Sequence, residues 1–193
     1  MDRIDSDAEY ESLELVGVDF SEQCASTVTL SRSHWTKVGL ARTRLQRLDI
    51  NRTKLEGCDL ANALWERARL EKVGLRESRL TGLNLSRSLL KECVFQACEA
   101  SYANFRAATF KKCRFVECNL RGADFQEADL RGVTFENCDL REAQLSFARL
   151  EGADFRGSEL ENLRVGMESL RGALVDPSQA AYLAGLMGLK VMY

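Results

Sequence analysis

Large apolar residues recur at every fifth position of this chain. All 33 positions divisible by five between residues 15 and 175 are apolar, in a sequence that is 45% apolar overall. An α-helix repeats its faces every 3.6 residues and a β-strand every two, so neither element explains this spacing. Self-similarity at a fixed period predicts a solenoid, in which each unit buries its apolar face by stacking on its neighbours.

The other positions of the five-residue unit are also regular. A small residue stands two places before the large one, as at Ala103, Ala123 and Ser88, and Asp or Asn often stands immediately before it, as at Asp124 and Asn104. Small and large residues would alternate inward and fill a narrow core. Asp and Asn favour turns because their short side chains bond nearby backbone amides. The pattern therefore predicts a chain that bends once in every unit.

The seven cysteines and the single histidine do not point to an active site. Six cysteines occupy the small inward position, namely Cys58, Cys93, Cys98, Cys113, Cys118 and Cys138. Their C-x4-C spacing follows the repeat and differs from the C-x2-C spacing of zinc sites, so we interpret them as core residues. His34 lies at an outward polar position with no nucleophile arranged beside it. We expect no enzyme activity, no metal and no cofactor.

At this spacing, the motifs ANF, ADF, ADL, CDL and CNL resemble those of the pentapeptide-repeat proteins, over about residues 13 to 175. The resemblance implies an all-β fold, a right-handed quadrilateral β-helix with four five-residue units in each coil. About eight coils at roughly 4.8 Å each would form a rod about 40 Å long. One side would stack Phe95, Phe115, Phe135 and Phe155, and one corner would stack Gly132, Gly152 and Gly172.

The sequence indicates a single domain in three segments. Residues 1–12 form an acidic N-terminal segment, residues 13–175 form the β-helix, and residues 176–193 form a capping helix and dimerisation tail. The acidic opening lacks the basic and apolar regions of a signal peptide, and no run of 18 apolar residues is present. We therefore expect a cytoplasmic protein that does not contact a membrane.

The period of five ends at the C-terminal tail, where a short helix is expected. Asp176 is predicted to cap its N-terminus, Pro177 to be its first residue and Gly188 to lie beyond its end. No residue from Pro177 to Leu189 is charged, so the helix lacks the polar face of a helix that packs on one side only. This composition indicates that the helix is buried on two sides.

A homodimer through this end of the rod would supply the second side. We expect Ala180, Leu183 and Met187 to cover the last coil, while Tyr182 and Leu186 point elsewhere. Phe147 and Met167, two apolar residues at outward repeat positions of one column, would add to the dimer surface. The expected dimer interface comprises Phe147, Met167, Tyr182, Leu183, Leu186, Met187, Leu189 and Val191.

Charge is distributed unevenly along the chain. Residues 1–31 have a net charge of −7 and residues 32–91 a net charge of +8, although the whole chain has a net charge of only −2. With four repeat units in each coil the basic residues form a stripe of two neighbouring columns, Arg47, Arg67 and Arg87 in one and Arg32, Arg52 and Lys72 in the other. This basic stripe either solvates the surface or meets an acidic protein patch or a phosphate backbone.

The tail sequence LRVGMESLRGALVDPSQAAYLAGLMGLKV, residues 163–191, resembles the end of the quinolone-resistance and topoisomerase-protection branch of the family. That resemblance implies a homodimer that binds DNA gyrase or topoisomerase IV as a DNA mimic and protects them from quinolones or a natural poison. The expected partner-binding acidic residues are Glu99, Asp139, Glu142, Glu159 and Glu161. The alternative is a general protein-interaction scaffold with an unrelated partner. Direct nucleic-acid binding is disfavoured, because no aromatic residues are interleaved with the basic stripe.

Overall fold

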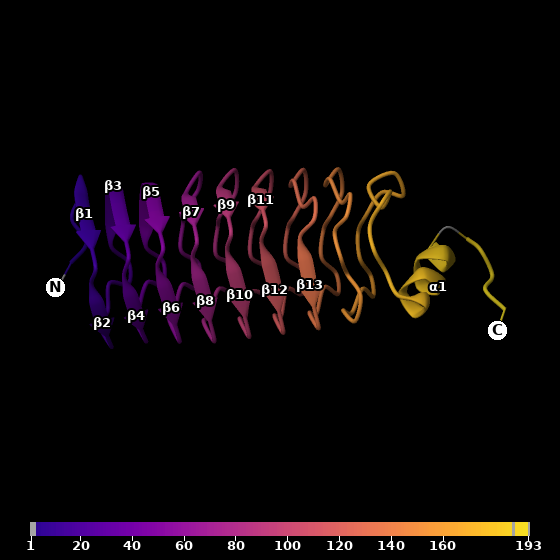
Figure 1. Ribbon diagram of the computed structural model, residues 1–193, viewed down its shortest axis with the longest axis horizontal. Coiled ribbons are helices and arrows are strands. Elements are labelled where there is room, and N and C mark those ends of the chain that lie inside the picture. Colours follow the sequence, from indigo (N-terminus) through magenta and orange to yellow (C-terminus); the bar gives the residue numbers. More distant parts are fainter. Residues whose placement is uncertain (1–2, 187, 193) are drawn as a thin grey trace.

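Short parallel strands stack along one axis and form two adjacent sides of a rod (Figure 1). The computed structural model describes residues 3–186 and 188–192. One sheet contains β1 (Ala8–Glu11), β3 (Cys24–Ser31), β5 (Arg44–Asn51), β7 (Arg69–Glu71), β9 (Leu89–Lys91) and β11 (Thr109–Lys111). The other contains β2 (Glu14–Val16), β4 (His34–Thr36), β6 (Lys54–Glu56), β8 (Gly74–Arg76), β10 (Val94–Gln96), β12 (Arg114–Val116) and β13 (Thr134–Glu136). The helix α1 (Pro177–Leu186) closes the C-terminal end.

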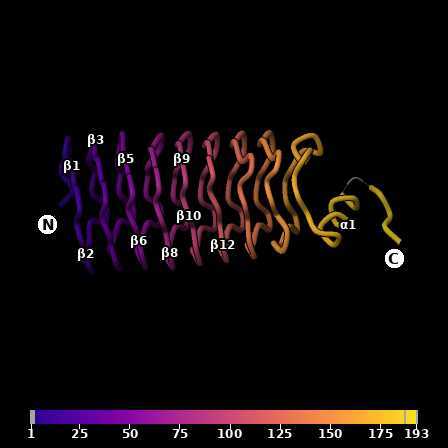
Figure 2. Tube along the Cα trace, in the orientation of Figure 1, coloured from indigo at the N-terminus to yellow at the C-terminus, as the bar shows by residue number. Residues whose placement is uncertain are grey.

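Every strand pairs with a strand four repeat units away in the sequence, which confirms the expected coil length. Leu15 lies beside Trp35, and Phe95 lies beside Phe115. Isolated bridges continue the same step along the other two sides and as far as Leu174, which pairs with Asp154. The trace in Figure 2 shows these turns succeeding one another from the N-terminus to α1. The fold is the all-β solenoid with a short C-terminal helix that the sequence predicts.

The boundaries of the regular strands differ from the expected ones. The seven-stranded sheet, which runs from β2 to β13, spans six turns, whereas about eight coils were expected. The turns after β13 are held by isolated bridges and not by regular strands. At the other end β1 already pairs with β3, so the regular coil spacing begins inside residues 1–12. Tyr10, one repeat unit before Leu15, packs against the core there.

Each turn has four corners, and every corner residue from 7 to 162 has a positive φ. These residues stand at positions 7, 12, 17 and onward in steps of five, and most of them are not glycine. The left-handed region is unfavourable for side chains with a Cβ, most of all for β-branched residues such as Thr27, whose φ is 56°. Hydrogen bonds between turns, such as that from the backbone N–H of Ser26, the neighbour of Thr27, to Ser6 Oγ, hold the chain in this path.

Large and small residues alternate inward as the sequence predicts. Phe95, Phe115, Phe135 and Phe155 form one stack with ring centroids 4.5, 5.2 and 5.1 Å apart. All six inward cysteines are buried, while Cys24 is exposed. The stacked rings and the small residues form one closely packed core along the rod. Burial raises the pKa of the Cys58 thiol, as expected of a core residue.

The helix α1 begins with a reciprocal cap that also fastens it to the rod. Asp176 Oδ1 accepts the Gln179 backbone N–H at 2.9 Å, and Gln179 Oε1 accepts the Asp176 N–H at 2.9 Å. The Gln179 amide also donates to the carbonyls of Phe155 and Ser158, at 2.6 and 2.7 Å. These two carbonyls belong to the last turns, so one side chain satisfies both the helix end and the end of the solenoid.

The inner face of α1 differs from the predicted one. Gln179 and Leu183 are buried, Tyr182 packs against the core, and Ala180 is exposed. The Asn162 N–H donates to the Tyr182 hydroxyl at 2.6 Å, so Tyr182 faces the rod and does not point away. The prediction was correct for Leu183 and wrong for Ala180 and Tyr182, because the Gln179 side chain, bonded to the Phe155 and Ser158 carbonyls, lies on the inner face and leaves Ala180 outside. Gly188, with a φ of 81°, lies beyond the helix end as predicted, and Met187 lies outside the described residues.

Candidate interaction surfaces

Chemically different faces lie on opposite sides of the rod. The six-stranded sheet of β1, β3, β5, β7, β9 and β11 occupies one side of the rod. A full turn takes four repeat units, so residues two units further along the chain lie on the opposite side. We call residues 27–32, 47–52, 67–72, 87–92 and 107–112 the basic face. We call the opposite side of the C-terminal half the acidic face, comprising Glu99, Tyr102, Asn119, Arg121, Asp139, Arg141, Glu142, Glu159 and Glu161.

The structure gathers the five predicted acidic residues on the acidic face. Glu99, Asp139 and Glu159 belong to one column, linked by the bridges from Glu99 to Asn119, Asn119 to Asp139 and Asp139 to Glu159. Glu161 follows Glu159 by two residues on the same side, and Glu142 stands at the adjoining corner. The column places one acidic or amide side chain at each turn, about 4.8 Å apart.

Two arginines interrupt the acidic face. Arg141 donates to both oxygens of Asp139, at 2.9 and 2.6 Å, and lies 3.1 Å from Glu159. Arg121 pairs with Glu142. The hydrogen bond from Arg141 keeps the pKa of Asp139 below its ordinary value. With Glu117, which stands at the first corner of the same side, six carboxylates against two guanidinium groups give this side of the C-terminal half a net charge of −4, a much smaller negative charge than that of a duplex of the same length.

Tyr102 is an exposed aromatic residue on the acidic face that the sequence analysis did not single out. Its side chain is 64% exposed at a corner with a φ of 56°. The ring lies along the next turn over Gly122, where an added Cβ would be 2.7 Å from Tyr102 Cε1. The signal was present in the sequence, because Gly122 stands one full turn after Tyr102 and leaves room for its ring. An exposed tyrosine among carboxylates has the character of an interface anchor.

The predicted basic stripe lies on the basic face. Arg47, Arg67 and Arg87 stand at one corner of successive turns, and Arg52 and Lys72 stand at the next corner. Lys72 lies 3.9 Å from Glu92, whereas the other four have no ion pair within residues 3–186 and 188–192. On the strands between the corners, Lys91 donates to Glu71 at 2.7 Å, which lowers the pKa of Glu71.

Comparisons with known proteins agree with this architecture. The family model described as "Pentapeptide repeat region" matches residues 28–105 and 88–165, which together cover more than half of the chain. The chain belongs to the pentapeptide-repeat family. No curated protein matches it.

Solved structures of other pentapeptide-repeat proteins are similar at low identity. Rfr23 from the cyanobacterium Cyanothece 51142 is 22% identical, with a TM-score of 0.50 over 58% of this chain and 86% of that one. QnrB1, a plasmid-mediated fluoroquinolone resistance protein, is 20% identical, with a TM-score of 0.44 over 96% of this chain and 100% of that one. HetL from Nostoc sp. strain PCC 7120, which is involved in heterocyst differentiation regulation, is 21% identical, with a TM-score of 0.39 over 87% of this chain and 86% of that one. At 22% identity, the match to Rfr23 shows a similar fold and nothing more.

The predicted dimer-interface residues of this pentapeptide-repeat protein divide into two groups. Leu183 and Tyr182 contact the rod and are used within the chain. Phe147 is 81% exposed at a corner, and Met167 stands at the equivalent position one turn later. The remaining exposed members are Leu186, Leu189 and Val191, and Met187 lies outside the described residues. The C-terminal end therefore keeps several large apolar side chains in contact with solvent.

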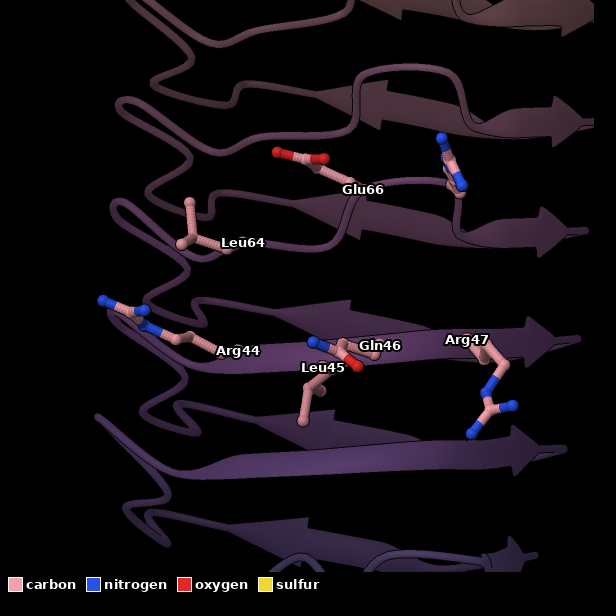
Figure 3. Close-up of a pocket in the computed structure, with 7 residues that line it drawn as sticks. Arg44, Leu45, Gln46, Arg47, Leu64 and Glu66 are labelled. Atoms are coloured by element: carbon pink, nitrogen blue, oxygen red, sulfur yellow. The ribbon is translucent and has the colours of Figure 1, made fainter.

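A surface groove of about 700 Å³ lies beside the corner that carries Arg47 and Arg67 (Figure 3). Arg44 and Arg47 stand at opposite ends of its β5 segment, with Leu45 and Gln46 between them. Leu64 and Glu66 come from the following turn. Glu66 accepts a hydrogen bond from Asn84 at 2.8 Å, so the structure gives its carboxylate an amide partner. The groove adds Arg44 to the cations near the basic face.

Two kinds of site are missing from the described part of the chain. Residues 3–186 and 188–192 contain no group of three His, Cys, Asp or Glu side chains arranged to hold a metal ion. Within the same residues, no helix is long and apolar enough to cross a membrane.

Proposed function

We propose that this pentapeptide-repeat protein is a non-catalytic binding protein that acts on DNA gyrase or topoisomerase IV through its acidic face. The observation that carries the proposal is the column Glu99, Asn119, Asp139 and Glu159, with exposed Tyr102 beside it. Regularly spaced carboxylates with an exposed aromatic side chain at one end of their column suit a protein surface that ordinarily binds DNA. The tail resemblance to the topoisomerase-protection branch supports the same choice.

In this proposal the protein works as a homodimer in the cytoplasm. Phe147, Met167 and Leu186 stay exposed at the C-terminal end, and a second copy would remove them from water. Joining two rods there would also double the length of the acidic face. Bound gyrase would then be shielded from quinolones or from a natural poison. No cofactor takes part.

A supercoiling assay with purified gyrase tests the proposal. We expect the protein to inhibit supercoiling or to relieve a quinolone, and the variant Glu99→Lys/Glu161→Lys to be weaker, with a smaller difference at high salt. The matched control is Glu136→Lys/Glu151→Lys, which changes the net charge equally on other sides of the same half. Absence of any effect of the wild-type protein at tens of micromolar, or equal loss in both variants, would refute the proposal.

Light scattering tests the dimer separately. The wild-type protein should be dimeric at micromolar concentration, and Leu186→Glu should shift it to a monomer because the charge would be buried without a partner. Leu64→Glu introduces the same charge at an exposed leucine far from the tail and should leave the dimer intact. A monomeric wild-type protein contradicts this part of the proposal.

A general scaffold with an unrelated protein partner is the second candidate. The pairing of Arg141 with both Asp139 and Glu159 favours it, because this pairing reduces the negative potential that a DNA-binding enzyme would recognise. Under this candidate Tyr102→Ala weakens partner binding, but gyrase is unaffected.

A further inference from the structure

The basic face has a large local charge that the proposed function does not use. Its five turns hold ten basic and three acidic side chains, a net charge of +7 in a chain whose total is −2. The ten basic residues are Arg32, Arg47, Arg52, Arg67, Arg69, Lys72, Arg87, Lys91, Lys111 and Lys112. The three acidic residues are Asp49, Glu71 and Glu92.

Six of these cations are available to a partner. Arg32, Arg69, Lys72 and Lys91 have carboxylate partners within the rod. The other six, Arg47, Arg52, Arg67, Arg87, Lys111 and Lys112, are exposed and have no ion pair within residues 3–186 and 188–192. Four of the six are arginines, whose planar fork binds phosphate with two hydrogen bonds.

The geometry of the basic face fits a regular polyanion. Arg47, Arg67 and Arg87 repeat at one corner with a step of one turn, about 4.8 Å. The next corner, one repeat unit further along and at most about 16 Å away, carries Arg32, Arg52, Lys72, Glu92 and Lys112 in successive turns, so Glu92 alone interrupts a second row of cations there. Two parallel rows at this separation can reach both strands of a duplex across its major groove, which is about 12 Å wide.

The chemistry between the rows disfavours a protein partner. Protein interfaces need an apolar or aromatic centre. The exposed large apolar side chains of residues 3–186 and 188–192 lie elsewhere, and none belongs to the basic face. The outward residues between the two rows are mostly polar, including Thr29, Ser31, Asn51 and Thr109. A polar, strongly positive surface is typical of nucleic-acid interfaces.

We propose that the basic face binds double-stranded nucleic acid through its phosphate backbone, without reading sequence. The lack of exposed aromatic residues on this face argues against a single strand, which is held by stacking, but not against a duplex. This inference therefore revises the expectation that nucleic acid is disfavoured. It is independent of the gyrase proposal, which rests on the opposite side of the rod.

Fluorescence anisotropy with a labelled duplex of about 20 base pairs, long enough to offer several phosphates to each row, tests the proposal. The wild-type protein should bind duplexes of unrelated sequence with similar affinity, and log K should fall linearly with log salt, with a slope of about −0.9 for each phosphate contact. Arg47→Gln/Arg67→Gln should reduce the steepness of this slope by about 1.8 and weaken binding about 60-fold at 0.1 M salt.

The matched control is Arg42→Gln/Arg79→Gln, which makes the same change in net charge on the opposite side of the rod. Both of these arginines are paired there, with Glu22 and Asp59. The control should bind duplex like the wild type, and both variants should keep the wild-type circular dichroism spectrum. Three results would overturn the proposal: no duplex binding at 0.05 M salt, equal loss in both variants, or tighter binding to polyglutamate than to duplex. The last of these would identify an acidic protein as the partner.

Discussion

Trp65 donates its indole N–H to the hydroxyl of Thr43 at 3.0 Å, inside the core and one turn away. Thr43 in turn donates to the Leu40 carbonyl at 2.8 Å. The other core tryptophan, Trp35, is equally enclosed, but its Nε1 has no hydrogen-bond partner among residues 3–186 and 188–192. The two indoles thus occupy similar apolar sites and differ in whether the N–H is satisfied.

This difference predicts unequal costs for the same substitution. Both Trp65→Phe and Trp35→Phe remove similar volume, but only Trp65→Phe breaks a hydrogen bond, while Trp35→Phe removes a buried unpaired donor. We expect Trp65→Phe to destabilise the protein by about 1–2 kcal/mol more than Trp35→Phe, as measured by urea unfolding. Equal unfolding midpoints would contradict the assignment of these partners.

The phenylalanine stack predicts where truncation is costly. Phe135 lies between Phe115 and Phe155 at 5.2 and 5.1 Å, and none of its surface reaches solvent. Phe135→Ala should cost about 3–5 kcal/mol, because a cavity would remain between rigid turns. Lys112→Ala, at an exposed corner, should change stability by less than about 0.5 kcal/mol. Chemical denaturation measures both, and similar costs would show that the inward positions are misassigned.

Gly122 and Gly132 form a natural pair for testing the position of Tyr102. Both have a positive φ, of 66° and 68°, so either alanine substitution brings the same backbone cost, about 1–2 kcal/mol. Only at Gly122 would the new Cβ strike a neighbour, the Tyr102 ring; no atom lies within 4 Å at Gly132. Fluorine NMR of fluorotyrosine-labelled protein should show a shifted Tyr102 signal in Gly122→Ala alone. An unchanged spectrum would mean that the ring does not rest on Gly122.

Asp176 predicts a loss of helix docking at low pH. Hydrogen bonds from Ser178 Oγ, the Gln179 N–H and the Gly157 N–H lower its pKa to about 2, from 3.8 when unfolded. The unfolded state therefore binds more protons between these values, so this contribution to stability is complete above about pH 4 and disappears as the pH falls towards 2. The Gln179 amide resonance should titrate over this range in the wild type and stay constant in Asp176→Asn. A midpoint near 4 in the wild type would argue against the cap.

The core of the rod follows from the sequence because one rule applies at every turn. Phe115, Phe135 and Phe155 stand at identical spacing and are buried together when a turn takes four repeat units, which the observed stack confirms. At the ends of the rod, stacking on a further turn is no longer available, so other contacts must satisfy the last backbone groups. Gln179 is polar and looks like a surface residue, yet the orphan carbonyls of the last turns need a donor, and this requirement is visible only once those turns are built.

The sequence predicts where the charged faces lie, but it does not predict how far ion pairs reduce their charge. The column that holds Glu99, Asp139 and Glu159 follows directly from a turn of four repeat units. The bidentate pair between Arg141 and Asp139 depends on side-chain rotamers, which the sequence does not reveal. This pair neutralises part of a face that the sequence presents as acidic. Tyr102 escaped notice because its meaning depends on a glycine one full turn later, not on any neighbour in sequence.

Because the step from turn to turn is constant, the length of the rod can change only by whole turns. Removing one whole turn, such as residues 86–105, would join Leu85 to Arg106, which stands at the same place in its turn as Ser86 does one turn earlier, and would shorten the rod by about 4.8 Å. The side that each remaining residue occupies would not change. Evolution or an engineer could therefore adjust the span between Arg47 and the C-terminal helix in fixed increments, independently of the chemistry at either end.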